Sequence, residues 1–465
     1  MDRRLVTPLC ALWVLWGSAA PAEVLVYPNG NRAPGDLAGI MGGNWGALAK
    51  GTDALFYNPA GLAAERGGAV SAGGEALRLQ DVAAGDARSE RLDASPGHLA
   101  WASGPARRGA AAPLGWGWYA HWPQDQDSSL SGRGSSTSAA ASLPEAIDTG
   151  GLDAFTDGVT RQERRSGDAA YSVLATGVAL GAELASGLSA GVGAVLERVR
   201  FRASASRLAT YAAGTEDGAS YRASIQESSR IEGVADRWAP LLGVQARPLA
   251  GLALGLALRL PSRALGGEGS VSYSRASQAT LSAAEGSVTL DELVLGEATG
   301  RQFELRTPLE ATLSAGLASG RFALVLEVIR SDGLPAYTVI DIPESEPPST
   351  AAFRPPAYRT GLRPRTRWGL GMSYAATDSA ALGIGFRDDT SAVSGEDRVF
   401  RQVDLYSIST GVILHRSNVA AALGLVYLVA PRQSVSFPSP LGDEREARSL
   451  DAQTLTLRVG ASWVL

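Results

Sequence analysis

The chain has 465 residues, of which 45% are hydrophobic, 19% charged and 7% aromatic, with 55 glycines and a formal net charge of −5. This length allows several ordinary domains or one large β structure, and the negative charge excludes a strongly basic face for nucleic acid. The only cysteine, Cys10, lies in the first segment of the chain, so the remainder has neither disulfides nor thiolate sites.

The first 22 residues have the pattern of a secretory signal peptide. Arg3 and Arg4 form a basic start, residues 5–16 an apolar core, and the letters AAPA a small-residue cleavage site before Glu23. We therefore expect an exported protein whose mature chain begins near residue 23.

The next segment, residues 23–66, is predicted to lie outside any regular wall of strands. It contains GIMGGNWGALAK (39–50) followed by GTDALFYNPAGLA (51–63). Asn58 and Pro59 form a turn-initiating pair, and the residues just before them can make one short apolar turn. The simplest interpretation of this segment alone is an N-terminal strap.

From residue 67 onwards the hydrophobic pattern has a period of two. Every second residue of 252–260 is a leucine, and small residues or an arginine lie between them. The same alternation recurs at 368–374, 382–387, 419–429 and 455–465. One face of each predicted strand is large and apolar, whereas the other is mostly Gly, Ala, Ser and Thr. This pattern is typical of an outer-membrane β-barrel, whose apolar face meets lipid and whose second face lines the lumen.

We predict about 14 antiparallel strands in residues 67–465, joined by alternating short and long connections. Short periplasmic turns, long extracellular loops and an even strand number are the expected features of such a barrel. The long connections fall at 123–167, 208–236, 263–301, 332–365 and 431–450. The predicted strands are 67–79, 97–103, 114–122, 168–183, 187–207, 237–248, 250–262, 302–318, 321–331, 366–376, 380–391, 402–415, 417–430 and 451–464.

A barrel of this size encloses a lumen that strand side chains cannot fill. The apolar segment before the first strand then has a place inside, and we interpret residues 23–66 as a hatch, or plug.

No catalytic, cofactor or metal-binding motif is present, so we expect no enzyme activity, no cofactor and no metal. His121 is interpreted as an interfacial girdle residue beside Trp118 and Trp122. Several charged residues fall on the small-residue face of their strands, and an interior ion-pair network is the simplest role for most of them. They are Glu197, Arg247, Arg259, Glu310, Glu327, Arg387 and Arg458.

These features resemble the FadL family of outer-membrane transporters of hydrophobic compounds. YNPAGLA (57–63) is similar to the Asn-Pro-Ala hatch motif of that family, and the likeness continues through LGWGWYAHWP (114–123), 238–262, 305–317 and 366–391. It covers nearly the whole mature chain, although the hatch motif is its most specific part.

The resemblance implies a 14-stranded barrel with an N-terminal hatch in the bacterial outer membrane. Its function would be passive uptake of hydrophobic molecules such as long-chain fatty acids, from a groove among the extracellular loops to an inner pocket. Hatch movement or a gap in the wall would then release the ligand. Carried over to this chain, Asn58, Pro59 and Ala60 would hold the hatch, and Gly115 and Gly117 are the positions for a kink in the third strand.

For a ligand site we predict an apolar floor of Leu55, Phe56 and Tyr57. An anionic lipid would pair with one of the inward arginines, because a guanidinium can donate two parallel hydrogen bonds to a carboxylate. The candidates are Arg247, Arg259, Arg387 and Arg458.

The expected partners are hydrophobic small molecules or lipids, outer-membrane lipid and the barrel-assembly machinery, with the chain acting as a monomer. The C-terminus is Trp463-Val464-Leu465, whereas a terminal aromatic residue is usual for barrel insertion. Residues 39–62 also resemble related barrels that scaffold secreted proteins, and a non-transporting scaffold is the alternative function. Apolar extracellular loops would favour transport, and wholly polar loops closed over the mouth would favour the scaffold.

Overall fold

The structure is a computed structural model. It describes residues 33–35, 37–65, 67–85, 87–104, 114–138, 159–214, 220–283, 286–340, 357–394, 397, 399–438 and 445–465. The predicted signal peptide and residues 23–32 of the predicted hatch lie outside these ranges.

Long antiparallel strands make up most of the described chain, after three short N-terminal helices. The helices are α2 (Leu37–Ile40), α3 (Gly51–Tyr57) and the 3₁₀ helix η2 (Pro59–Ala64). The strands are β1 (Gly68–Ala84), β2 (Ala87–Ser103), β3 (Leu114–Ser138), β4 (Val159–Ala185), β5 (Leu188–Gly214), β6 (Ser220–Leu249), β7 (Leu252–Arg259), β8 (Arg263–Ala283), β9 (Gly286–Gln302), β10 (Glu310–Ser319), β11 (Phe322–Ser331), β12 (Leu334–Ile340), β13 (Tyr358–Leu362), β14 (Arg365–Thr377), β15 (Ala380–Asp389), β16 (Leu405–Arg416), β17 (Val419–Pro438) and β18 (Arg445–Val464). No helix within the described ranges combines the length and the apolar character needed to cross a membrane.

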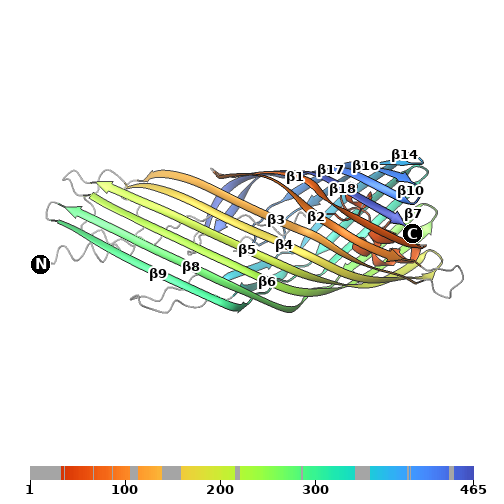
Figure 1. The fold of residues 1–465 in the computed structure, drawn as a ribbon, viewed down its shortest axis with the longest axis horizontal. Coiled ribbons are helices and arrows are strands. Elements are labelled where there is room, and N and C mark those ends of the chain that lie inside the picture. Colours follow the sequence, from red (N-terminus) through yellow and green to blue (C-terminus); the bar gives the residue numbers. More distant parts are fainter. Residues whose placement is uncertain are drawn as a thin grey trace.

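Fourteen of these strands close into one antiparallel barrel (Figure 1), as the alternating pattern predicts. The wall runs β1 to β7, then β10, β11, β14 to β18, and the pairing of β1 with β18 closes it. Closure leaves every strand of the wall with two neighbours, so the ladder has no open edge at membrane level.

The wall is much taller on one side than the sequence predicted. The predicted loops at 123–167, 208–236 and 263–301 consist largely of strand, because β3 to β6 continue outward and β8 pairs with the outer part of β6. Figure 1 shows β3 to β6, β8 and β9 projecting together beyond the other strands. The short segment 269–274, predicted to extend a hairpin beyond the membrane, lies in β8.

One predicted boundary is wrong: the strand expected at 302–318 begins only at Glu310 as β10. Residues 303–309 before it turn inward instead, and Phe303 and Leu305 are buried in the lumen. These two residues have apolar side chains that the period-two pattern could not distinguish from lipid-facing ones.

The outer surface carries a continuous apolar belt. Large apolar side chains on every wall strand are exposed, including Leu180, Val192, Leu254, Leu326 and Leu423 at 43–52% of their full accessible area. A belt of this extent around a closed barrel is suited to a lipid bilayer.

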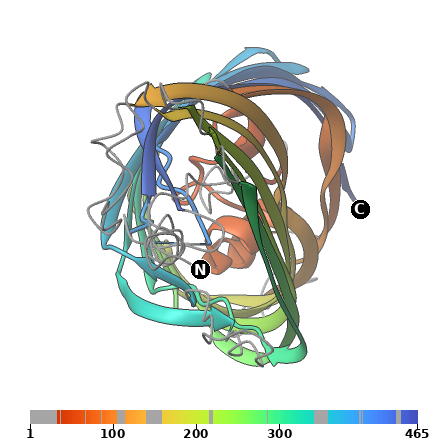
Figure 2. The same cartoon turned by 90° about the vertical axis from the view of Figure 1, so that its left-hand side faces the viewer.

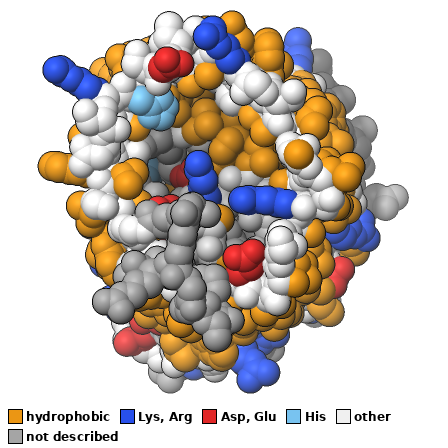
Figure 3. Space-filling model, turned by 90° about the vertical axis from the view of Figure 1, so that its right-hand side faces the viewer, with side chains coloured by type: hydrophobic (Ala, Val, Ile, Leu, Met, Phe, Trp, Pro, Cys, Tyr) orange, Lys and Arg blue, Asp and Glu red, His pale blue; other side chains and the backbone are white. Residues whose placement is uncertain are grey.

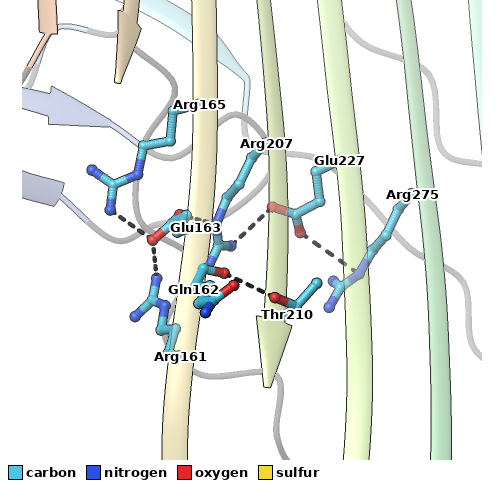
Figure 4. Close-up of polar contacts among 8 residues, drawn as sticks. All are labelled: Arg161, Gln162, Glu163, Arg165, Arg207, Thr210, Glu227 and Arg275. Atoms are coloured by element: carbon cyan, nitrogen blue, oxygen red, sulfur yellow. Dashed lines mark hydrogen bonds and ion pairs between the residues drawn. The ribbon is translucent and has the colours of Figure 1, made fainter. Parts of the chain in front are cut away.

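The inner face of the tall side contains a buried ion-pair network (Figure 4). Glu163 accepts from Arg161 and Arg165 at 2.7 Å each, and Arg207 bridges Glu163 and Glu227. Arg275 of β8 lies 3.7 Å from Glu227 on the other side. Four neighbouring strands, β4, β5, β6 and β8, therefore share paired charges in the lumen, as expected for interior charges that lack water.

Candidate functional site

The N-terminal helices lie inside the ring of strands (Figure 2), and Figure 1 places them at the end of the barrel where the short turns lie. We call residues 33–35 and 37–65 the hatch. Figure 3 shows that end of the molecule, with a hollow that has hydrophobic side chains on its inner wall and Lys or Arg side chains near its centre.

Asn58 fixes the hatch to the wall. Its side-chain Nδ2 donates to the carbonyl of Val244 in β6 at 3.0 Å and to that of Leu256 in β7 at 3.4 Å. Its Oδ1 accepts from the Ala60 N–H at 3.2 Å and so caps η2, where Pro59 occupies the first turn. Asn is a favoured N-cap and Pro a favoured first helical residue, so the Asn-Pro-Ala motif both starts a helix and ties it to two strands.

Other polar side chains of the wall bind the hatch backbone in the same way. Gln245 donates to the Ala47 carbonyl at 2.6 Å, and Glu327 accepts from the Gly46 N–H at 2.5 Å. Ser409 and Arg458 of the wall likewise donate to the carbonyls of Ile40 and Ala33. In the opposite direction, the hatch side chain of Asn44 donates to the Phe386 carbonyl of the wall. A buried short segment must satisfy its backbone polar groups, and these wall residues do so for the hatch.

Inward glycines let the hatch approach the wall closely. A Cβ on Gly115 would lie 2.2 Å from the Leu62 carbonyl oxygen, and one on Gly117 would lie 3.1 Å from Cδ2 of Leu55. Other wall glycines against the hatch are Gly181, Gly191, Gly243, Gly255, Gly369, Gly371, Gly383 and Gly385. The high glycine content thus corresponds to the contact surface of the hatch.

The two glycines predicted at a kink of the third strand lie in a regular ladder. β3 pairs with β4 without interruption from Leu114 to His121, and its register shifts only between His121 and Gln124. The irregularity therefore lies at Trp122 and Pro123, where proline removes a backbone donor.

A cavity of about 190 Å³ lies between the hatch and the wall. Leu55, Phe56 and Tyr57 of the hatch line it, as the predicted apolar floor requires. Apolar wall residues around it include Tyr119, Ala175, Val195, Leu241 and Ile329. Phe56 is central, with its ring centroid 4.8 Å from that of Tyr119.

Two of the four candidate arginines line this cavity, and they differ in their pairing. Arg259 is bound to Glu197, with Nη2 and Oε1 2.6 Å apart, and Glu197 also holds Arg237. Arg387 has neither an ion pair nor a hydrogen bond to any other described residue, and its Nε is buried. Arg387 is therefore the cation at this cavity that is not already neutralised by a neighbour at contact distance.

The other two candidates lie elsewhere. Arg458 donates to the Ala33 carbonyl at 2.5 Å and lines a separate small cavity beside His98. Arg247 is exposed beyond the β6–β7 register shift, at the turn end of the barrel. The alternation along the strand predicted that the Arg247 side chain points into the lumen. The register shift between Ala246 and Leu249 places it outside the lumen instead.

The interpretation of His121 as a girdle residue is wrong. His121 is 7% exposed and points into the lumen, where its ring centroid lies 5.7 Å from that of Phe56. It pairs across the ladder with His98, whose ring is 5.5 Å from Phe56. Both histidines contribute to the packing of the hatch.

The interior network predicted for the lumen charges forms only in part. Glu197 and Glu310 are paired with arginines, whereas Glu327 binds hatch backbone and Arg387 is unpaired among the described residues. The sequence reasoning did not single out Gln245, Asn44 or Ser409 as ties, although each is a lone polar residue among small ones.

A second apolar region fills the lumen above the cavity. Phe201 of β5 lies against Phe303 and Phe400, with ring centroids 6.3 and 6.2 Å away, and Phe400 also meets Tyr171 of β4. Phe400 lies between β15 and β16, so its contacts with Tyr171 and Phe201 show that its segment reaches into the lumen as far as β4 and β5. We call this group the mouth cluster: Tyr171, Phe201, Phe303 and Phe400.

Asp397 anchors the segment that carries Phe400. Its Oδ1 accepts from the N–H groups of Val399 and Phe400 at 2.8 Å each, and its Oδ2 accepts from Gly361 N–H and the Thr360 hydroxyl. Burial raises the pKa of this carboxyl, and the hydrogen bonds oppose that shift. The apolar side chains of the mouth cluster are thus buried inside the lumen.

Within the described residues, no group of three or more His, Cys, Asp or Glu side chains is arranged to hold a metal ion.

Comparisons with known proteins identify the fold. No family model and no curated protein matches the chain. Among solved structures it resembles a FadL homologue of Pseudomonas aeruginosa (12% identity, 95% of this chain and 100% of that one, TM-score 0.57). It also resembles the toluene transporter TodX of Pseudomonas putida (12%, 95% and 100%, TM-score 0.54) and the monoaromatic hydrocarbon channel CymD (13%, 94% and 98%, TM-score 0.51). This chain has the fold of those proteins over nearly its full length.

Proposed function

We propose that this protein is a channel of the bacterial outer membrane for passive uptake of hydrophobic small molecules. The observation that carries the proposal is the lumen cavity at Phe56, which lies between the hatch and the wall. Apolar side chains line it together with charged ones, Glu197, Arg259, Glu310, Glu327 and Arg387. Ligand sites are typically apolar pockets with a few placed polar groups. The resemblance to proteins described as a toluene transporter and a hydrocarbon channel supports the same class of cargo.

Within this class, a molecule with an apolar body and an anionic head fits the cavity best, and a fatty acid is the first candidate. Arg387 makes no ion pair or hydrogen bond at contact distance within the described residues, so its guanidinium can bind a carboxylate. Glu310 and Glu327 line the same cavity and attract it from further away. The cavity of about 190 Å³ is larger than the cavity of roughly 150 Å³ that accepts benzene. A long acyl chain needs more space, so its full entry requires the hatch or the mouth cluster to move.

The release route that we propose is lateral, between β2 and β3. The backbone pairing between β2 and β3 ends at His98 and His121. Beyond this point, within the described residues, β2 pairs only with β1 and β3 only with β4, so no ladder joins β2 to β3. Side chains bridge the gap instead: Ser95 donates to Asp125 at 2.7 Å. Because side-chain contacts replace a ladder here, this is the part of the wall that separates most easily, and it lies beside the cavity residues His121 and Pro123.

The alternative, a non-transporting scaffold, requires a mouth without affinity for apolar molecules. The mouth cluster is aromatic, which favours the channel. The mouth cluster is compatible with a scaffold only if its side chains never separate to admit an apolar molecule.

The test is ligand retention measured by native mass spectrometry in mild detergent. The wild-type protein should retain added decanoate, and Arg387→Gln should retain it at least tenfold more weakly. Arg416→Gln removes an exposed arginine at the turn end and should retain it normally. If both variants retained decanoate equally, Arg387 would not be part of the ligand site. If the wild type retained no decanoate, the result would favour the scaffold.

A further inference from the structure

The outer face of β5 changes character abruptly where the apolar belt ends. Its outward residues Leu188, Val192 and Leu196 are exposed apolar side chains. The next three outward positions are Arg198, Arg200 and Arg202, and all three are exposed. Three consecutive cationic positions therefore lie at the level where lipid tails give way to headgroups.

The neighbouring strand β6 only partly neutralises these arginines. Arg198 lies 3.2 Å from Asp236, and Arg202 lies 3.4 Å from Glu232, which also holds Arg230. Arg200 has no ion pair or hydrogen bond within the described residues. Along β5 and β6 the patch thus has four arginines against two carboxylates. The exposed carboxylates of Asp168 on β4 and Glu268 on β8 lie on the same outer face beside it.

The paired arginines remain accessible as well. Arg198 and Arg202 keep 54% and 57% of their side-chain area exposed. Exposed ion pairs of this kind contribute little stability, so their guanidiniums can exchange a carboxylate partner for a phosphate at small cost.

Directly above the arginines, the outer face becomes rich in hydroxyl groups. A depression of about 640 Å³ crosses the outer parts of β4, β5, β6, β8 and β9. Arg230 lines it together with the acceptors Asp168 and Glu297. The serines that line it on the outward side are Ser166, Ser204, Ser206, Ser228, Ser272 and Ser274.

These serines are held in cross-strand pairs. The hydroxyl oxygens of Ser166 and Ser206 lie 2.7 Å apart, and those of Ser228 and Ser274 also lie 2.7 Å apart. Each hydroxyl can both donate and accept, so a paired row still offers hydrogen-bonding capacity to a ligand. A concave surface of hydroxyls and carboxylates suits a saccharide, whose own hydroxyls donate and accept in the same way.

Apolar belt, arginine patch and serine-lined depression follow one another along the same strands. A glycolipid of the outer leaflet has acyl chains, phosphates and sugars in the same order. We propose that the outer face of β4, β5, β6 and β8 binds a phosphorylated glycolipid, with arginines on its phosphates and serines on its sugars. This surface is distinct from the lumen cavity, and its occupant is a resident membrane lipid rather than cargo.

The test compares lipid binding to the purified barrel in nanodiscs doped either with lipid A, a phosphorylated and acylated glucosamine disaccharide, or with phosphatidylglycerol. Each arginine near an anionic surface contributes about 1 kcal/mol. Arg200→Gln combined with Arg202→Gln should therefore weaken lipid A binding roughly thirtyfold, which corresponds to about 2 kcal/mol. Arg321→Gln combined with Arg416→Gln removes the same charge from exposed positions at the turn end and should leave binding unchanged.

A second variant tests the saccharide part separately. Ser204→Trp fills the depression without changing charge and should weaken lipid A binding at least fivefold, with no effect on phosphatidylglycerol. Heat-modifiable gel mobility confirms that each variant is folded. Equal affinity of the wild type for lipid A and phosphatidylglycerol would overturn the proposal. So would lipid A binding that is the same in the arginine variant and its control.

Discussion

Substitution of Asn58 by alanine should release the hatch without unfolding the barrel. The change removes the hydrogen bonds to Val244 and Leu256 and the cap on Ala60. A net hydrogen bond contributes about 1 kcal/mol and loss of an Asn N-cap costs about 1 kcal/mol. Because the contact to Leu256 is long, the total is on the order of 2 to 3 kcal/mol.

This free energy raises the population of the displaced hatch by between about thirtyfold and 150-fold. Hydrogen–deuterium exchange of peptides covering α3 and η2 measures this change directly, since local opening governs exchange there. The barrel strands have ladder bonds that the substitution does not touch, so their exchange should stay the same.

Asn418→Ala is the matched control. Asn418 is exposed, and its side chain donates to the Val464 carbonyl at the turn end. Hatch exchange in this variant should equal that of the wild type. If Asn58→Ala also left hatch exchange unchanged, the hatch would be held by close packing against the glycines, and the role assigned to Asn58 would be refuted.

Three further predictions concern the two closures of the lumen. Deletion of residues 36–62 should leave a folded barrel with higher single-channel conductance in planar bilayers; unchanged conductance would mean that the segment does not occlude the lumen. Gly115→Ala should loosen the hatch in the same exchange assay, because its Cβ would meet the Leu62 carbonyl, whereas Gly266→Ala has open space and should have no effect. Asp397→Ala removes four hydrogen bonds and should make the segment 397–404 a site of protease cleavage in the folded barrel; resistance equal to that of the wild type would show that Phe400 alone holds it.

The barrel was predictable because its chemistry repeats at every second residue. At 252–260 the leucines face lipid and the small residues face the hatch. The residue type on each face of the strand therefore indicates what that face contacts. The tall side of the wall was not predictable in this way. Beyond the mouth cluster, the inner faces of β4 and β5 carry charged residues such as Glu163 and Arg207, and the outer faces carry serines and arginines. No continuous apolar face distinguishes strand from loop there.

The site was predictable in its location and only partly in its contacts. Leu55, Phe56 and Tyr57 were expected at a pocket because they are apolar and precede the Asn-Pro break. Gly115, Gly117 and His121 occupy alternate positions on the same face of β3, and that face points into the lumen. The sequence alternation could therefore have predicted an inward His121. The tie from Asn58 to Val244 spans 186 residues of sequence, and no local pattern specifies which strand receives it.

Pairing of the lumen arginines also depends on contacts that the sequence does not specify. Arg259 and Arg387 occupy equivalent positions after inward small residues. Only the first meets a carboxylate at contact distance, because β5 brings Glu197 to the same height. The register of the strands, rather than the composition, therefore determines that Arg387 has no carboxylate at contact distance.

Uptake across the outer membrane is the most direct test of the channel. Cells of a host that lacks its own channel for hydrophobic compounds should take up labelled decanoate or toluene when they express this protein. Val195→Trp should abolish the uptake while the barrel still inserts, because the indole occupies the cavity beside Phe56. Uptake no faster than in cells without the protein, or uptake that Val195→Trp leaves unchanged, would contradict passage through this cavity.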